Sequence, residues 1–165
     1  MDKETLLAAM EFTRVRVIGT LDTIAKSGQN PSKVLAWRPG SGRAHIAWQA
    51  MHMAATHDRY INERLCQKPV SDPELNQRFG GGSTPSDQNV PDLETIRRTL
   101  EKHYTHARDY FRALAPSEIE RAIVFPNNVK RTIGESCVLL TFHEAHHQGQ
   151  MHLTWNLYKA AHGVA

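Results

Sequence analysis

The chain has 165 residues, among them 10 histidines, and carries 20 basic against 17 acidic residues, for a formal net charge of +3. This length suits a single domain, residues 1–165, and a mild positive charge without a basic run argues against nucleic acid as a partner. No apolar run approaches the roughly 18 residues of a membrane span, no signal-peptide pattern follows the N-terminus, and two cysteines are too few for a disulfide framework. We therefore expect a soluble, cytoplasmic protein with no membrane partner.

The first half of the chain predicts two long helices separated by irregular segments. Apolar residues at steps of three and four predict a helix that begins after Asp2, its N-cap, and ends at Ser27 and Gly28. Residues 30–42 are expected to form a loop, with Ser41 capping a second helix over about residues 43–66. Residues 70–91 contain three consecutive glycines and three prolines. They predict a long irregular loop that could cover the mouth of a site.

The second half predicts two further helices and little else. Helix three is expected over residues 93–114, and helix four from a capping box at Thr132 and Glu135 to about residue 161. Between them, residues 123–125 are extended at most, and residues 126–128 form a turn. Four long helices without a credible sheet predict an all-α four-helix bundle, with the irregular loop between helices two and three.

Two of the predicted helices are almost free of charge. Residues 44–57 contain no Asp, Glu, Lys or Arg, and Glu144 is the only such residue from 136 to 158. A surface helix of this length carries several charges, so both helices are expected to be packed on most sides. Buried imidazoles and amides cost free energy unless they are hydrogen-bonded or bind a metal. The polar residues of these two helices are therefore the place to look for a site.

Histidines on these helices have the spacing of metal ligands. At about 100° per residue, His143 and His147 lie roughly 40° apart on one face of helix four, while His146 lies on the other flank of His143 as an alternate. On helix two, either His45 or His52 could supply a third ligand. Three imidazoles from two helices leave coordination positions open for water or a thiolate, as in catalytic metal sites. The alternative is that these histidines are core residues bonded to backbone or hydroxyl groups.

The segment from His143 to His147 also fits H-E-x-x-H, the zinc-binding motif in which the glutamate is the general base of a metallohydrolase. The chain predicts no strand that would align a peptide and no third-ligand motif downstream, which argues against proteolysis. Glu144 is more simply a carboxylate that orients a histidine. A metallohydrolase stays as a third hypothesis, with Glu144 beside the metal-bound water.

The residues that carry these patterns resemble the DinB/YfiT-like superfamily. The resemblance covers nearly the whole chain in helix order, and its specific content is the octet from His143 to Gln150, the His52 region, and the Trp-Arg-Pro of residues 37–39. It implies a four-helix bundle, often dimeric, with a divalent ion held by His52, His143 and His147. Gln148 stands where the family usually has arginine.

The resemblance leaves the other polar residues of the two helices with supporting roles. Glu144 and His45 remain candidate catalytic residues. Four residues are expected to support the ligands from behind or to line the pocket: Trp48, Gln49, His146 and Gln150.

Characterised members of the superfamily that this chain resembles include S-transferases and a maleylpyruvate isomerase that use low-molecular-weight thiols. The resemblance therefore implies a metal-dependent enzyme, a thiol S-transferase or a hydrolase, that acts on a small molecule with zinc or nickel and a thiol as cofactors. A metal can hold a thiol as thiolate at neutral pH and place it beside an electrophile. The competing hypothesis is a non-enzymatic metal-binding or stress-related interaction protein. A homodimer is expected from the resemblance alone.

Overall fold

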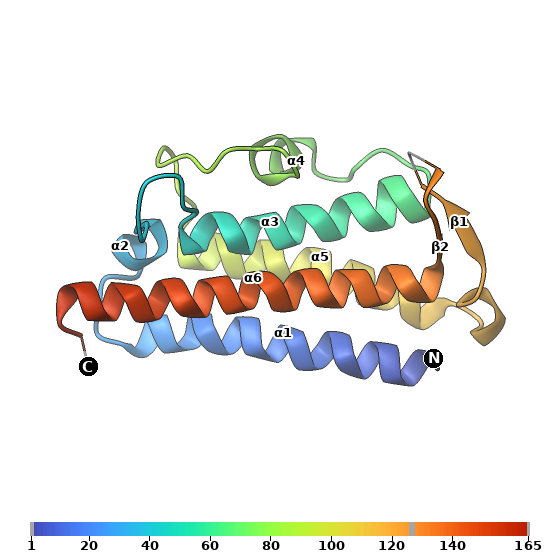
Figure 1. Cartoon of the computed structure of the whole chain (residues 1–165), viewed down its shortest axis with the longest axis horizontal. Coiled ribbons are helices and arrows are strands. Elements are labelled where there is room, and N and C mark those ends of the chain that lie inside the picture. Colours follow the sequence, from blue (N-terminus) through green and yellow to red (C-terminus); the bar gives the residue numbers. More distant parts are fainter. Residues whose placement is uncertain (1, 126–127, 165) are drawn as a thin grey trace.

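Four long helices form the body of the molecule in a computed structural model that describes residues 2–125 and 128–164 (Figure 1). They are α1 (Lys3–Lys26), α3 (Ile46–Arg59), α5 (Leu93–Ala113) and α6 (Ile133–His162). Helices α1 and α6 run in one direction and α3 and α5 in the other, and α6 packs against both α1 and α3. The predicted all-α four-helix bundle is confirmed.

The N-terminal ends of α1 and α6 are fixed by the predicted caps. The Asp2 carboxylate accepts a hydrogen bond from the Thr5 backbone N–H at 2.9 Å. At the start of α6, the Glu135 N–H donates to Thr132 Oγ1 at 3.0 Å, and the Thr132 N–H donates to Glu135 Oε2 at 2.7 Å. Each pair satisfies N–H groups that the first turn of a helix leaves without partners. The helix starts read from the sequence are therefore confirmed.

The second long helix differs from its prediction at both ends. Helix α3 begins at Ile46 with His45, not Ser41, as the N-cap, because the His45 ring accepts the N–H of Trp48. At its other end it passes at Tyr60 into a π-helical turn, η1 (Tyr60–Leu65). The preceding segment, expected to be a loop, contains the short helix α2 (Pro31–Ala36).

Residues 70–91 are not wholly irregular, because they contain helix α4 (Pro73–Phe79). Asp72 caps this helix, Pro73 stands in its first turn, and Leu75 and Phe79 are buried against the core that includes α3. An Asp cap followed by proline and an i, i+4 apolar pair is a helix-start signal. The neighbouring glycines and prolines outweighed that signal in the prediction, which was wrong for these seven residues.

A small hairpin connects the last two long helices and follows the short 3₁₀ helix η2 (Pro116–Glu118). Strand β1 (Ala122–Val124) pairs antiparallel with β2 (Lys130–Thr132), so that Ile123 lies opposite Arg131. The expectation of no sheet was therefore wrong in this one place. Of the turn predicted at residues 126–128, the first two residues lie outside the described part of the chain.

The two charge-free helices are buried to different extents. Helix α3 is buried along most of its length, as expected. Helix α6 is not, because Val138, Phe142 and Leu153 are exposed on its outer side, and Phe142 is 68% exposed. Its lack of charge therefore reflects a partly apolar outer face. No helix among the described residues is long and apolar enough to cross a membrane.

Candidate metal centre

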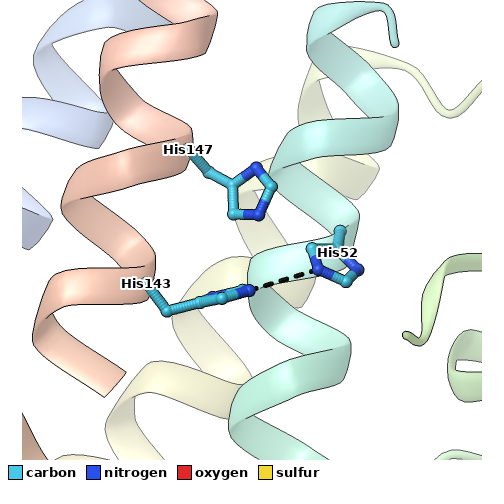
Figure 2. A group of neighbouring side chains, drawn as sticks. All are labelled: His52, His143 and His147. Atoms are coloured by element: carbon cyan, nitrogen blue, oxygen red, sulfur yellow. Dashed lines mark hydrogen bonds between the residues drawn. The ribbon is translucent and has the colours of Figure 1, made fainter. Parts of the chain in front are cut away.

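Three histidines from two helices converge inside the bundle. Figure 2 shows His143 and His147 projecting from α6 toward His52 on α3. One ring nitrogen from each lies within 4.8 Å of those from the other two. These are the three ligands predicted from helical spacing and the family resemblance together. The two helices place them because residues 143 and 147 are one turn apart and α6 packs directly on α3.

The spacing of the nitrogens suits a first-row divalent ion. His143 Nε2 and His52 Nε2 are 3.2 Å apart. Two imidazole nitrogens that bind one tetrahedral zinc ion at about 2.0–2.1 Å lie roughly 3.3 Å from each other. This pair therefore has the spacing of two ligands of one ion, and the third nitrogen lies within 4.8 Å of both. Three protein ligands would leave at least one coordination position open.

His52 is held in the orientation that a ligand requires. Its Nδ1 hydrogen-bonds to the backbone carbonyl of Phe79, the last residue of α4. A carbonyl only accepts, so Nδ1 carries the proton and the Nε2 lone pair faces the cluster. Trp48, one turn earlier on α3, stacks on the ring with centroids 4.7 Å apart and planes 9° from parallel. Such contacts behind a metal-binding histidine fix its tautomer and its rotation.

All three imidazoles are kept neutral by their surroundings. Burial, and then the neighbouring histidines, lower the pKa of His143 to about 4 and that of His147 to about 3. Burial also lowers the pKa of His52, against the opposing effect of the Phe79 hydrogen bond. Because a metal binds the unprotonated ring, these histidines need lose no proton to bind an ion at neutral pH.

His45 does not belong to the cluster. Its Nδ1 accepts the Trp48 N–H at 3.0 Å, and its Nε2 lies 3.0 Å from the carbonyl of Ser86. The ring therefore caps α3 and ties the loop before α5 to it, and both nitrogens are engaged. Neither nitrogen is left free to move a proton at the cluster.

The amide residues expected near the site differ in how close they lie to it. Gln150 on α6 bonds the exposed ring of His146 at 2.9 Å. Gln49 is buried and lines a separate pocket together with Gln150. Gln148, in the position where the family usually has arginine, directs its amide to Thr20 on α1 at 3.4 Å. Of the four predicted pocket residues, Trp48 stacks on His52, and His146 contacts the His147 ring edge-on with centroids 5.2 Å apart. The Gln150 side chain also reaches His147, where its hydrogen bond opposes the lowering of the His147 pKa.

Glu144 is committed to a buried ion pair away from the cluster. Its Oε1 lies 3.0 Å from Arg14 Nε on α1, and its Oε2 lies 3.5 Å from His57 Nε2 on α3. Glu144 is only 2% exposed, and burial raises its pKa to about 7 against the opposing effect of Arg14. Both carboxylate oxygens are thus used by partners outside the cluster. This geometry gives no support to the H-E-x-x-H reading, in which Glu144 lies beside the ion.

A comparison of the sequence with known protein families identifies one that covers this site. A model of the DinB superfamily matches residues 9–151, which include all three cluster histidines. The chain belongs to the DinB superfamily. No curated protein matches the chain. The DinB match ends at Met151, four residues beyond His147, so the matched region contains the whole candidate centre.

Some residues around this DinB centre were not anticipated from the sequence. The Phe79 carbonyl that orients His52 lies in α4, a helix that was not predicted. Arg59 and Arg64 line the pocket beside the cluster. A signal for Arg59 was available, because residues 52, 56 and 59 follow one face of a helix at steps of four and three.

Proposed function

We propose that this protein is a metal-dependent enzyme that holds one zinc or nickel ion through His52, His143 and His147. The observation that carries the proposal is the convergence of three neutral imidazoles, one of which is oriented by a backbone carbonyl. Core histidines without a ligand role would each bond to backbone or hydroxyl groups. Here one nitrogen of His52 bonds to the Phe79 carbonyl, and the other lies 3.2 Å from His143 Nε2, within hydrogen-bond distance.

The residues of the chain would perform three tasks at this centre. A bound divalent ion supplies Lewis-acid activation of a low-molecular-weight thiol or of water at neutral pH. The Phe79 carbonyl and the Trp48 ring keep His52 in place while the other rings bind. A pocket lined by His52 and His143 gives a small molecule access to the cluster. A thiol S-transferase or a hydrolase would use this arrangement.

The alternative is a non-enzymatic metal-binding protein in which the ion only stabilises the bundle. The pocket beside His52 and His143 favours the enzyme, because a purely structural site is closed by its ligands. We place the protein in the cytoplasm, since Cys66 and Cys137 are both unpaired, as in a reducing compartment.

We further propose that two copies pair through the outer face of α1 and α6. These helices lie side by side (Figure 1) and expose Phe12, Val15, Phe142 and Leu153. From residue 136 to 158, the only charged side chain of α6 is Glu144, which is buried. A second copy that approaches with the same surface therefore meets no like charge from this stretch of α6, as a twofold contact requires.

The metal proposal is tested by elemental analysis of untagged protein purified without chelator. About one ion per chain is expected in the wild type and in His152→Ala, and substantially less in His147→Ala. His152 is the matched control, because it is an exposed histidine of the same helix. A wild type that holds no ion after incubation with zinc or nickel would leave the histidines as core residues and favour a non-enzymatic helical interaction protein.

A further inference from the structure

A pocket of about 220 Å³ opens directly onto the histidine cluster. Its walls come from His52 and the residues that follow it on α3 and η1, from the loop after α4 at Gly80 and Gly81, and from His143 on α6. This is far more room than the roughly 10–15 Å³ that one water needs by the same measure. It therefore suits a small molecule, or one end of a larger molecule.

The charged residues that line this pocket are both arginines. Arg59 and Arg64 belong to its wall, and no described Asp or Glu does. Glu63 lies between them, 3.1 Å from Arg59 Nε and 3.4 Å from Arg64 Nη2. One carboxylate thus serves two guanidinium groups. A positive charge remains for a ligand.

A third arginine approaches the same wall from the hairpin. Arg131 Nη1 donates to the hydroxyl of Tyr60, which lines the pocket, at 3.2 Å. The hydroxyl of Thr56 adds a further polar group to the lining. The pocket therefore combines one end that binds metal with a wall of hydrogen-bond donors.

The helix geometry explains why these groups gather beside His52. Residues 52, 56 and 59 share one face of α3 at helical steps of four and three, and Tyr60, the first residue of η1, follows them in the pocket wall. At Tyr60 the helix widens into the π-turn η1, which carries Arg64 to the same pocket. Single π-turns inserted in α-helices occur frequently at functional sites. The same helix therefore supplies both a metal ligand and the cationic wall.

We propose that the small molecule used at this centre carries a carboxylate, which binds Arg59 and Arg64 while the opposite end of the molecule reaches His52 and His143. This inference rests on the proposed metal function and adds a substrate class to it. Guanidinium groups bind planar carboxylates through paired hydrogen bonds. A neutral analogue of the same size would lose those bonds and leave both arginines as they are in the free protein.

The test compares two thiols of nearly equal size, 3-mercaptopropionate and 3-mercaptopropionamide, in which an anionic carboxylate is replaced by a neutral amide. Each is titrated calorimetrically into zinc-loaded wild type, Arg59→Gln/Arg64→Gln and Arg112→Gln. The acid is expected to bind the wild type about tenfold more tightly than the amide, because its hydrogen bonds are charge-assisted. The preference should disappear in the double variant and persist in Arg112→Gln, an exposed control on α5. Metal content should be equal in all three proteins.

A second readout separates this inference from the metal proposal. The same two thiols are added to metal-free protein while the arginine Nε–Hε resonances are followed by NMR. The acid alone should shift the resonances of Arg59 and Arg64. Equal behaviour of acid and amide in both experiments overturns the carboxylate assignment and leaves the metal proposal intact. A preference for the acid in a protein that binds no ion upholds the assignment and removes the metal proposal.

Discussion

Among single residues, His52 has the most constrained ring of the three cluster histidines. The Phe79 carbonyl fixes its tautomer and the Trp48 indole fixes its rotation. His143 and His147 are placed by their positions on α6 and by contact with each other, with ring centroids 4.6 Å apart. The metal affinity of the centre should therefore depend on the residues that support His52 as well as on the ligands themselves.

Trp48→Leu is expected to weaken zinc binding by about tenfold without abolishing it, because the His52 ring loses its stacked neighbour. Affinity is measured by competition with a chromophoric chelator. Trp37→Leu is the control, since Trp37 packs against the same core but meets Tyr158 and His162 edge-on instead of a cluster histidine. Equal affinities in the two variants would show that the indole has no orienting role.

Glu144→Gln separates the ion-pair role of this residue from a catalytic role. Removing one partner of a buried pair leaves Arg14 without its counter-charge, which costs about 3 kcal/mol or more of unfolding free energy. Metal content should remain at the wild-type level, because the carboxylate faces Arg14 and His57. Urea unfolding and elemental analysis of the same sample give both quantities. Lost metal with unchanged stability would restore the H-E-x-x-H hypothesis.

Among the elements of the fold, α4 connects the loop after α3 to the histidine cluster. The Asp58 carboxylate on α3 accepts hydrogen bonds from Asn62, Ser71, Asp72 and Asn76, and so holds the start of α4. The end of α4 is Phe79, whose carbonyl orients His52. A buried carboxylate on one turn of α3 thus supports a ligand located on an earlier turn of the same helix.

Asp58→Asn should reduce stability by about 2 kcal/mol at pH 7, because a charged acceptor of several hydrogen bonds is lost. Burial raises the pKa of Asp58, but hydrogen bonds from Ser71 and Asp72 outweigh it, and the net pKa lies below the ordinary 3.8. The ionised group therefore stabilises the fold above about pH 3.8, and this contribution is lost as the pH falls through the lowered value. The titratable neighbour His103 faces Asp58 from α5 at 3.8 Å, and burial lowers its pKa.

Urea unfolding of the wild type and Asp58→Asn at several pH values between 7 and 3 checks this prediction. The difference between the two proteins should be largest at neutral pH and shrink below pH 4. Asp109→Asn, which removes an exposed carboxylate on α5, serves as the control and should resemble the wild type throughout. A difference that does not change with pH would assign the effect to packing instead of charge.

The elements that could be predicted are those whose signal is local. Caps at Asp2 and Thr132 and the steps of three and four between apolar residues determine where the long helices lie. The pair His143 and His147 follows from one turn of one helix. The partner of Glu144 could not be predicted, because Arg14 is distant in sequence and only the packing of α1 on α6 brings it near. The same holds for Phe79, which reaches His52 through the fold.

Across the whole molecule, polar and apolar surfaces are divided between two sides of α6. One side carries the cluster histidines toward α3, and the outer side, with its neighbour α1, exposes apolar residues. Helix α6 therefore has few charged residues for two reasons: one side is packed toward α3, and the other side is an exposed apolar face. If the outer face pairs with a second copy, the contact lies on α1 and α6, while the pocket walls come mainly from α3, η1 and the loop after α4.

Phe142→Glu is expected to convert a dimer into a monomer, because pairing two copies through this face would bury a charge of the same sign in each copy. Phe142 is 68% exposed, so the substitution should leave the folded chain itself intact. Val124→Glu is the matched control, since Val124 is 59% exposed but lies on the hairpin, outside this face. Sedimentation equilibrium should give twice the chain mass for the wild type and the control, and the single mass for Phe142→Glu. A wild type that sediments as a monomer at concentrations of about 100 µM would exclude pairing through this face, and metal content measured on the same samples would show whether the centre needs a partner.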